Sequence, residues 1–448
     1  DLQEVGEVPW ESLAAGDEVR IHWRADPYRA KWVVVVEGTE QAPFVIRGVP
    51  GPAGELPVID GRDATTRAEL DFWNEDRGVI KIGGSSNPPD DTPTWIVIEN
   101  LEIRSGRPPY QFTGGDGLSA YRENSASVFI EKGEHVVLRN CVLHDSGNGL
   151  FASHAARDVL VEGCWIHGNG IEGSIYEHNN YTEAFGIVFQ YNLFGPLRDG
   201  CPGNNLKDRS AGTVIRYNWI EGGNRQLDLV DSDDASFYDD PLYRTTYVYG
   251  NVLIEPEGAG NSQIVHYGGD SGDTARYRKG TLHFYHNTVV STRVGNTTLF
   301  RLSTNEEDCD CRNNIVYVAA DGQQLAMLDS TGALTLRNDW FKTGWRDCHG
   351  DLTGSVQDLG GILDGQDPGF SDGDGGDYHL AAGSVCIDAG TDLHTGVLPD
   401  HAVLRQYVPH QGGEPRPVDA AADMGAFEAS EADTTPPRAP TSLTVTAP

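Results

Sequence analysis

The chain has 448 residues, with 67 Asp and Glu against 33 Lys and Arg, and a formal net charge of −34. This charge argues against nucleic acid and anionic membrane surfaces as partners, and no apolar run reaches the 18 residues or so that a membrane-spanning helix needs. It suits a secreted protein in a saline or calcium-rich medium. An anionic polysaccharide would need a local basic patch or a bound cation to offset the field.

Residues 8–61 contain three apolar segments separated by turn residues. Four short motifs mark these segments, in chain order Gly16-Asp17, Gly38-Thr39, Pro43 and Asp60-Gly61. This layout resembles the start of secreted right-handed parallel β-helix polysaccharide lyases and their relatives. The resemblance implies that residues 8–61 form the first, N-terminal coil of such a helix.

From residue 96 to residue 345 one short unit recurs every 23–40 residues. The unit consists of two apolar residues, a polar residue, an Asn or Gly, any residue, and two further apolar residues. The Asn or Gly positions are Asn100, Asn140, Gly163, Asn192, Asn218, Asn251, Asn287, Asn314 and Asn338. The alternating Val, Ile, Leu and aromatic residues favour strands with one buried face. Asn and Gly suit a sharp corner because they tolerate positive φ, and stacked corner asparagines can hydrogen-bond along the axis.

The repeat length selects the fold. A propeller would need about four strands in each unit of roughly 40–50 residues, which the shorter spacings cannot hold. The sequence therefore predicts an all-β, single-stranded, right-handed parallel β-helix with long loop excursions and an irregular C-terminal cap. Trp165 and Trp219 are expected in its core, and Cys141 and Cys164 are expected to stack as a buried apolar pair without a disulfide.

Five polar or turn-rich excursions interrupt the coils, and such excursions are where function is usually mounted. They span 62–95, 105–128, 169–186, 231–245 and 268–280.

Residues 364–428 depart from the coil pattern and read DGQDPGF, DYHLAAGSVCIDAG and DMGAFE. They resemble a tail common in secreted right-handed β-helix proteins, which extends the predicted β-helix domain over 1–430. Residues 431–448 resemble a Pro/Thr linker running into a fibronectin type III-like module, although a plain disordered terminus is the alternative. Because the chain begins at Asp1, we expect that an N-terminal piece has been removed, in keeping with extracellular, bacterial-type secretion.

A second strand follows the corner in several repeats, at 149–154, 204–210, 225–231, 262–268 and 298–304. Alternation puts Leu206, Leu227, Leu229, Phe300 and Leu302 inward, and leaves Lys207, Arg209, Asp228 and Arg301 outward. Either His266 or Tyr267 faces out, depending on register. Since stacked coils lie about 4.8 Å apart, the outward residues should form one charged surface.

That surface suits β-elimination on a uronic acid sugar, which needs donors or a cation on the carboxylate and a base within reach of the C5 proton. The candidate catalytic residues are Lys207, Arg209, Asp228, His266 and Tyr267. The candidate substrate-binding residues are His178, Tyr181, Glu183, Arg225, Tyr238 and Arg301. Asp231, Asp233 and Asp234 form a candidate Ca²⁺ site, and no organic cofactor is expected.

The arrangement resembles calcium-dependent β-helix lyases, in which a strand lysine is the base, and the resemblance gives that role to Lys207. The chain departs from the pattern in having LDLVD in place of the Arg-bearing strand, and Pro202-Gly203-Asn204-Asn205 in place of the acidic calcium motif.

Two other interpretations remain open. Asp228 with Asp231 or Asp233 could serve a glycoside hydrolase, and a solvated salt-bridge patch would fit a non-catalytic glycan-binding or adhesion solenoid. In each case we expect a monomer with a polysaccharide partner. Lys207→Ala is expected to abolish activity with little change in thermal stability, and chelators are expected to weaken activity if the Asp-rich loop holds calcium.

Overall fold

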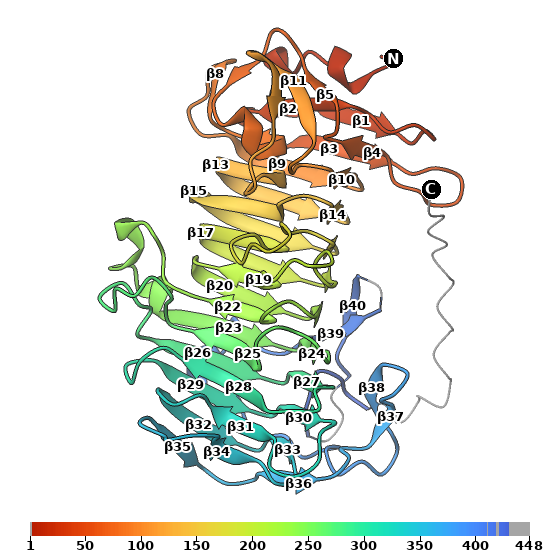
Figure 1. Ribbon diagram of the computed structural model, residues 1–448. Helices are drawn as coiled ribbons and strands as arrows, with labels where there is room; N and C mark the ends of the chain where they lie inside the picture. The colour runs from red at the N-terminus through yellow and green to blue at the C-terminus, as the bar shows by residue number, and fades with distance from the viewer. Residues whose placement is uncertain (1, 410, 418–420, 430–448) are drawn as a thin grey trace.

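The alternating apolar segments form short parallel strands that stack coil upon coil, as the computed structural model shows for residues 2–409, 411–417 and 421–429 (Figure 1). Each coil contributes strands to three ladders, here called the first, second and third faces. The predicted parallel β-helix is confirmed. No helix in the described part of the chain has the length and apolar character needed to cross a membrane.

The first face is a continuous parallel ladder. Its strands are β2 (Ala30–Val34), β7 (Gly78–Ile82), β13 (Ala126–Arg139), β15 (Asn148–Glu162), β17 (Asn180–Gln190), β19 (Leu206–Asp208), β22 (Leu227–Leu229), β25 (Gln263–Tyr267), β28 (Thr297–Leu302), β31 (Leu325–Leu328) and β34 (Arg346–Cys348).

The second face shares the long strands β13, β15 and β17. Its other strands are β1 (Glu18–His22), β3 (Phe44–Val49), β9 (Thr94–Glu99), β20 (Ala211–Arg216), β23 (Thr245–Tyr249), β26 (Thr281–Tyr285), β29 (Asp308–Arg312), β32 (Ala333–Arg337) and β35 (Ser355–Asp358).

The third face is a separate ladder of eleven strands. They are β4 (Val58–Asp60), β10 (Glu102–Arg104), β14 (Val142–His144), β16 (Trp165–His167), β18 (Leu193–Phe194), β21 (Trp219–Glu221), β24 (Val252–Glu255), β27 (Thr288–Ser291), β30 (Ile315–Val318), β33 (Trp340–Lys342) and β36 (Leu363–Gly365).

Short elements lie outside the three faces. Near the N-terminus they are η1 (Val5–Glu7), η2 (Trp10–Ser12), β5 (Ala64–Thr66), β6 (Asp71–Phe72), η3 (Glu75–Arg77), β8 (Ser85–Asn87), β11 (Gln111–Gly114) and β12 (Gly117–Ala120). Farther along are η4 (Ala235–Phe237), η5 (Pro241–Arg244), β37 (Phe370–Asp372), β38 (Asp377–Leu380), η6 (Thr395–Val397), β39 (Arg405–Val408) and β40 (Gly412–Pro415).

The corner before the third face differs by one residue from the predicted alignment. Asn140 and Gly163 have positive φ, but in the next two coils the positive φ belongs to Tyr191 and Tyr217. Asn192 and its successors lie one position later and form the expected hydrogen-bonded ladder: the backbone N–H of Asn192, Asn218, Asn251, Asn287 and Asn314 each donates to the side-chain oxygen one coil onward, ending at Asp339.

Cys141 and Cys164 occupy the same inward stack as these asparagines. Both are buried and free, so the expected apolar pair is confirmed. The prediction that Trp165 and Trp219 lie in the core is wrong. Ile166 and Ile220 point into the core, which turns the neighbouring Trp165 and Trp219 outward on the third face, and Trp219 stacks on Tyr378 of the tail.

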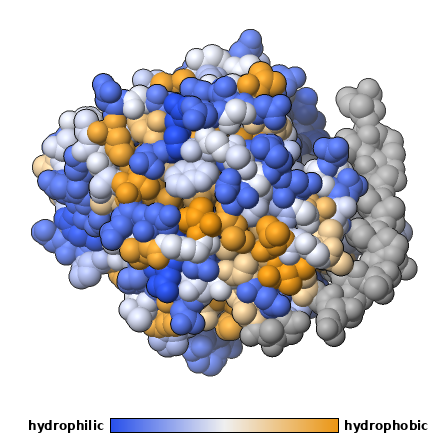
Figure 2. Space-filling model, turned by 90° about the horizontal axis from the view of Figure 1, so that it is seen from below, coloured by the Kyte–Doolittle hydropathy of each residue, from blue (hydrophilic) through white to orange (hydrophobic). Residues whose placement is uncertain are grey.

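The tail after β36 runs back along the outside of the third face (Figure 1). Tyr378, Tyr407 and Phe427 pack there against Val252 and Val290. Apolar groups remain visible among hydrophilic ones at the end of the stack near β36 (Figure 2). The predicted linker and fibronectin-like segment at 431–448 falls outside the described residues.

Candidate functional site

One row of outward side chains runs along the first face. The strand register aligns, coil by coil, Lys81, Phe129, Phe151, Tyr181, Lys207, Asp228, His266 and Arg301. Leu206, Leu227, Leu229, Phe300 and Leu302 point inward as predicted. The register also decides the ambiguous pair: His266 faces outward, whereas Tyr267 is 0% exposed in the core. The prediction of Tyr267 as a catalytic residue is therefore wrong.

Lys207 lies between two carboxylates. Its Nζ is 2.6 Å from Asp228 Oδ2 and 2.5 Å from Asp270 Oδ2, and the residue is only 5% exposed. Burial by itself lowers the pKa of the Lys207 ammonium, but attraction to Asp228 and Asp270 outweighs it and raises that pKa. Lys207 is thus a protonated, enclosed cation, not the solvated side chain or free base that the sequence suggested.

Asp228 is the hub of a buried network and is 2% exposed. It accepts from Lys207, from Asn204 Nδ2 at 2.7 Å, and from His266 Nδ1 at 2.7 Å. Burial opposes its ionisation, yet Lys207 and His266 hold its pKa well below the usual range.

His266 continues the network to Ser303. Because a carboxylate only accepts, the Nδ1 of His266 carries the proton that points at Asp228. Its Nε2, 3.0 Å from Ser303 Oγ, then accepts from that hydroxyl. Burial lowers the pKa of His266, which keeps the ring neutral.

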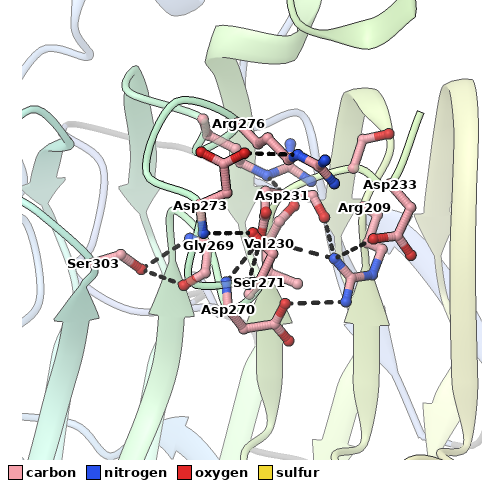
Figure 3. Close-up of polar contacts among 12 residues, drawn as sticks. Arg209, Val230, Asp231, Asp233, Gly269, Asp270, Ser271, Asp273, Arg276 and Ser303 are labelled. Atoms are coloured by element: carbon pink, nitrogen blue, oxygen red, sulfur yellow. Dashed lines mark hydrogen bonds and ion pairs between the residues drawn. The ribbon is translucent and has the colours of Figure 1, made fainter. Parts of the chain in front are cut away.

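Asp270 contacts two cations, Lys207 in β19 and Arg209 just after that strand. Its Oδ2 contacts Lys207. Its Oδ1 accepts from Arg209 Nη2 at 3.0 Å (Figure 3). Arg209 Nε donates to the Tyr181 hydroxyl at 2.9 Å, and its Nη1 donates to the Asp231 carbonyl. No local sequence signal marks Asp270, because the excursion 268–280 reaches this position only by folding over the first face.

Hydrogen bonds to residues of the underlying coils hold the 268–280 loop in place. Asp231 Oδ1 accepts from the N–H groups of Asp270 and Ser271 at 2.7 and 3.3 Å, and Gly269 N donates to Ser303 Oγ at 2.9 Å (Figure 3). The buried Arg278 donates to the Val230 carbonyl at 2.9 Å. The Asp270 side chain is 32% exposed, so its carboxylate reaches the surface of the protein.

Tyr181 and His178, two of the candidate substrate-binding residues, border this cluster. Their rings stack at 5.6 Å, and His178 Nδ1 accepts from Asn204 N at 2.9 Å. Burial, with Lys207 adding to it, lowers the pKa of His178 to about 3, so the ring is neutral. Burial raises the pKa of Tyr181, and the charges of Arg209 and Lys207 offset only part of that rise.

The other predicted substrate-binding residues are mostly engaged elsewhere. Glu183 accepts from the backbone of Asp233 and Asp234 at 2.8 and 3.2 Å, so it anchors the 231–245 loop. Tyr238 donates to the Ser232 carbonyl within that loop at 3.2 Å. Arg225 lies 4.0 Å from Asp228 and donates to Gln263 at 2.7 Å. Arg301 is exposed beside His266.

The predicted calcium ligands do not converge. Asp231 is buried and holds the 268–280 loop, the Asp233 side chain is 62% exposed, and Asp234 caps η4 through Ser236 N at 2.9 Å. These donors do not fit a Ca²⁺ site. Among the described residues, the group whose potential ligand atoms lie within 4.8 Å of one another is Glu134, His135 and Asp158, away from Lys207 at the edge of the second face.

Comparison with known proteins gives fold likeness only. No family model matches the chain, and no curated protein sequence matches it. Matching solved structures include an alginate lyase from Paenibacillus sp. str. FPU-7, 10% identical, with a TM-score of 0.48 over 75% of this chain and 94% of that one. Others are the pectate lyase Pel9A (12% identical, TM-score 0.47, 94% and 89% covered) and a GH136 lacto-N-biosidase from Eubacterium ramulus (12%, 0.49, 79% and 62%).

Proposed function

We propose that this chain is a secreted carbohydrate-active enzyme that cleaves a uronic acid-containing glycan by β-elimination. The observation that carries the proposal is the position of Asp270, one carboxylate held by Lys207 at 2.5 Å and by Arg209 at 3.0 Å. A uronate carboxylate has the same charge and the same two acceptor oxygens. It can take this place when the Asp270 side chain rotates outward.

At this place the two cations would neutralise the carboxylate of the bound uronic acid sugar, which β-elimination requires. Lys207 and Arg209 stabilise the negative charge that spreads onto the carboxylate when the C5 proton leaves. We assign removal of that proton to the Tyr181 oxygen, 2.9 Å from Arg209 Nε, acting as tyrosinate after its own proton has passed to solvent. Burial opposes this ionisation, which the charges of Arg209 and Lys207 favour. The C5 electron pair forms the C4–C5 double bond, the C4–oxygen bond breaks, and the departing oxygen takes a proton from solvent.

Hydrolysis is the second candidate, because Asp228 and Asp270 both contact the Lys207 ammonium. A glycosidase pair needs one carboxyl group that stays protonated as the acid. Burial opposes ionisation of both groups, but Lys207 outweighs it and lowers the pKa of each. This favours elimination over hydrolysis.

The test is a panel of polygalacturonate, alginate, hyaluronan and neutral polysaccharides, read by the ultraviolet absorbance of unsaturated uronate and by new reducing ends. Elimination gives both signals on an acidic glycan, and Tyr181→Phe removes them. Tyr238→Phe, which changes a tyrosine that is also half-buried but lies in the 231–245 loop, is the control and retains activity. Reducing ends without absorbance would indicate a hydrolase, and neither signal would leave a glycan-binding solenoid.

A further inference from the structure

A hollow of about 440 Å³ lies on the first face, upstream of the Lys207 cluster. Its lining includes Trp73, Arg77, Phe129, Glu131, Phe151 and His154. Phe129 and Phe151 belong to the outward row that continues through Tyr181 to Lys207, and Phe151 stacks on Tyr181 at 5.0 Å. The floor of the hollow is therefore continuous with the proposed site.

Arg77 enters the hollow from η3 and lies over two of these rings. Its guanidinium carbon is 4.7 Å from the Phe129 centroid and 4.6 Å from the Phe151 centroid. Within the described residues its side chain makes no ion pair, and its buried Nε has no hydrogen-bond partner. Arginine stays charged in proteins, and a half-buried cation without an anionic partner is costly. Such a group is matched when an anion binds.

The neighbouring acids do not supply that anion. Glu131 accepts from Trp73 Nε1 at 2.6 Å and pairs with Lys81 at 2.7 Å. Glu183 holds the 231–245 loop. Arg77 is therefore a locally unpaired positive group in a chain whose net charge is −34.

Trp73 adds a flat apolar surface at the same place. It is 48% exposed although large aromatic side chains are mostly buried. Its ring orientation is fixed by the hydrogen bond from Nε1 to Glu131. A rigid indole beside an unpaired guanidinium can contact the apolar face of a sugar ring while the arginine binds a charged substituent.

We propose that this hollow binds an acidic sugar of the glycan, with its carboxylate on Arg77 and its ring against Trp73, next to the sugar held at Lys207 and Arg209. The assignment of a uronate-containing glycan rests on the proposed function. The new element is a second carboxylate-binding position. It would make the enzyme require a carboxylate on the neighbouring sugar as well as on the sugar at which the chain is cleaved.

Calorimetric titration tests this with galacturonate and alginate hexamers and with the same hexamers after carboxyl reduction. The protein carries Tyr181→Phe throughout so that no substrate is consumed. Arg77→Gln should weaken binding of an acidic hexamer at least about tenfold, or about 1.4 kcal/mol, and leave the reduced hexamer unaffected. Arg77→Lys should lose less, and Trp73→Ala should weaken both ligands.

Arg157→Gln is the matched control, because Arg157 also stacks on a phenylalanine, Phe185, at 4.5 Å but lies outside the hollow. It should bind as the parent does. Unchanged affinity in Arg77→Gln, or no binding of any acidic hexamer by the parent, would overturn the inference. Arginine-dependent binding without unsaturated product in the wild type would support the hollow and refute elimination. Unsaturated product with arginine-independent binding would do the reverse.

Discussion

Lys207→Ala gives the sharpest test of the site, because the structure reverses an expectation from the sequence. An outward lysine on a solvated strand would add little stability, but this one is enclosed between Asp228 and Asp270. Its removal leaves Asp228, 2% exposed, with only His266 and Asn204 as donors. Removing one partner of a buried ion pair costs about 3–5 kcal/mol; with these two donors remaining, we expect a loss of about 2–4 kcal/mol.

Urea unfolding followed by tryptophan fluorescence measures this loss. Lys279→Ala is the control, since Lys279 pairs with the exposed Glu306 at 2.6 Å and should cost no more than about 1 kcal/mol. Adding Asp228→Asn to Lys207→Ala should restore part of the stability by removing the stranded charge. The folded-state pKa of Asp228 is lowered, so its contribution in the wild type is present above pH about 4 and is lost as pH falls further. Equal losses in the two lysine variants would refute the buried-pair reasoning.

Three further outcomes are expected. Burial raises the pKa of Asp339, the last residue of the asparagine ladder, to about 7. Its ionisation therefore destabilises the fold progressively between about pH 4, the ordinary value in the unfolded chain, and about pH 7, and Asp339→Asn should gain at least about 1 kcal/mol above that range. A wild-type melting temperature that stays constant across this range would contradict the reasoning. Chelation by EDTA should change activity by less than roughly twofold, since Asp231, Asp233 and Asp234 do not converge on a cation; abolished activity would show that a metal is needed. Tyr267→Phe should keep full activity because the ring is in the core, and a large loss of activity in a folded variant would return Tyr267 to the mechanism.

Part of the site was predictable because β alternation is local. The period of two placed Leu206, Leu227 and Leu229 inside and Lys207 and Asp228 outside. The same rule could have identified Phe129 and Phe151, which precede Tyr181 in the outward row. Neither side chain carries a charge or a polar group, so residue type alone does not mark them as site residues.

The sequence by itself determined the repeat, the parallel stack of coils and the coil-to-coil neighbours, because the apolar period and the corners act within a few residues. Only the tertiary structure decided which of His266 and Tyr267 faces out, since one residue of register exchanges the two sides of a strand. It also decided that the 268–280 loop brings Asp270 onto Lys207 and Arg209, and that Arg77 from η3 lies over Phe129 and Phe151. Those contacts join residues far apart in the chain, and their positions depend on how each excursion folds back over the stack.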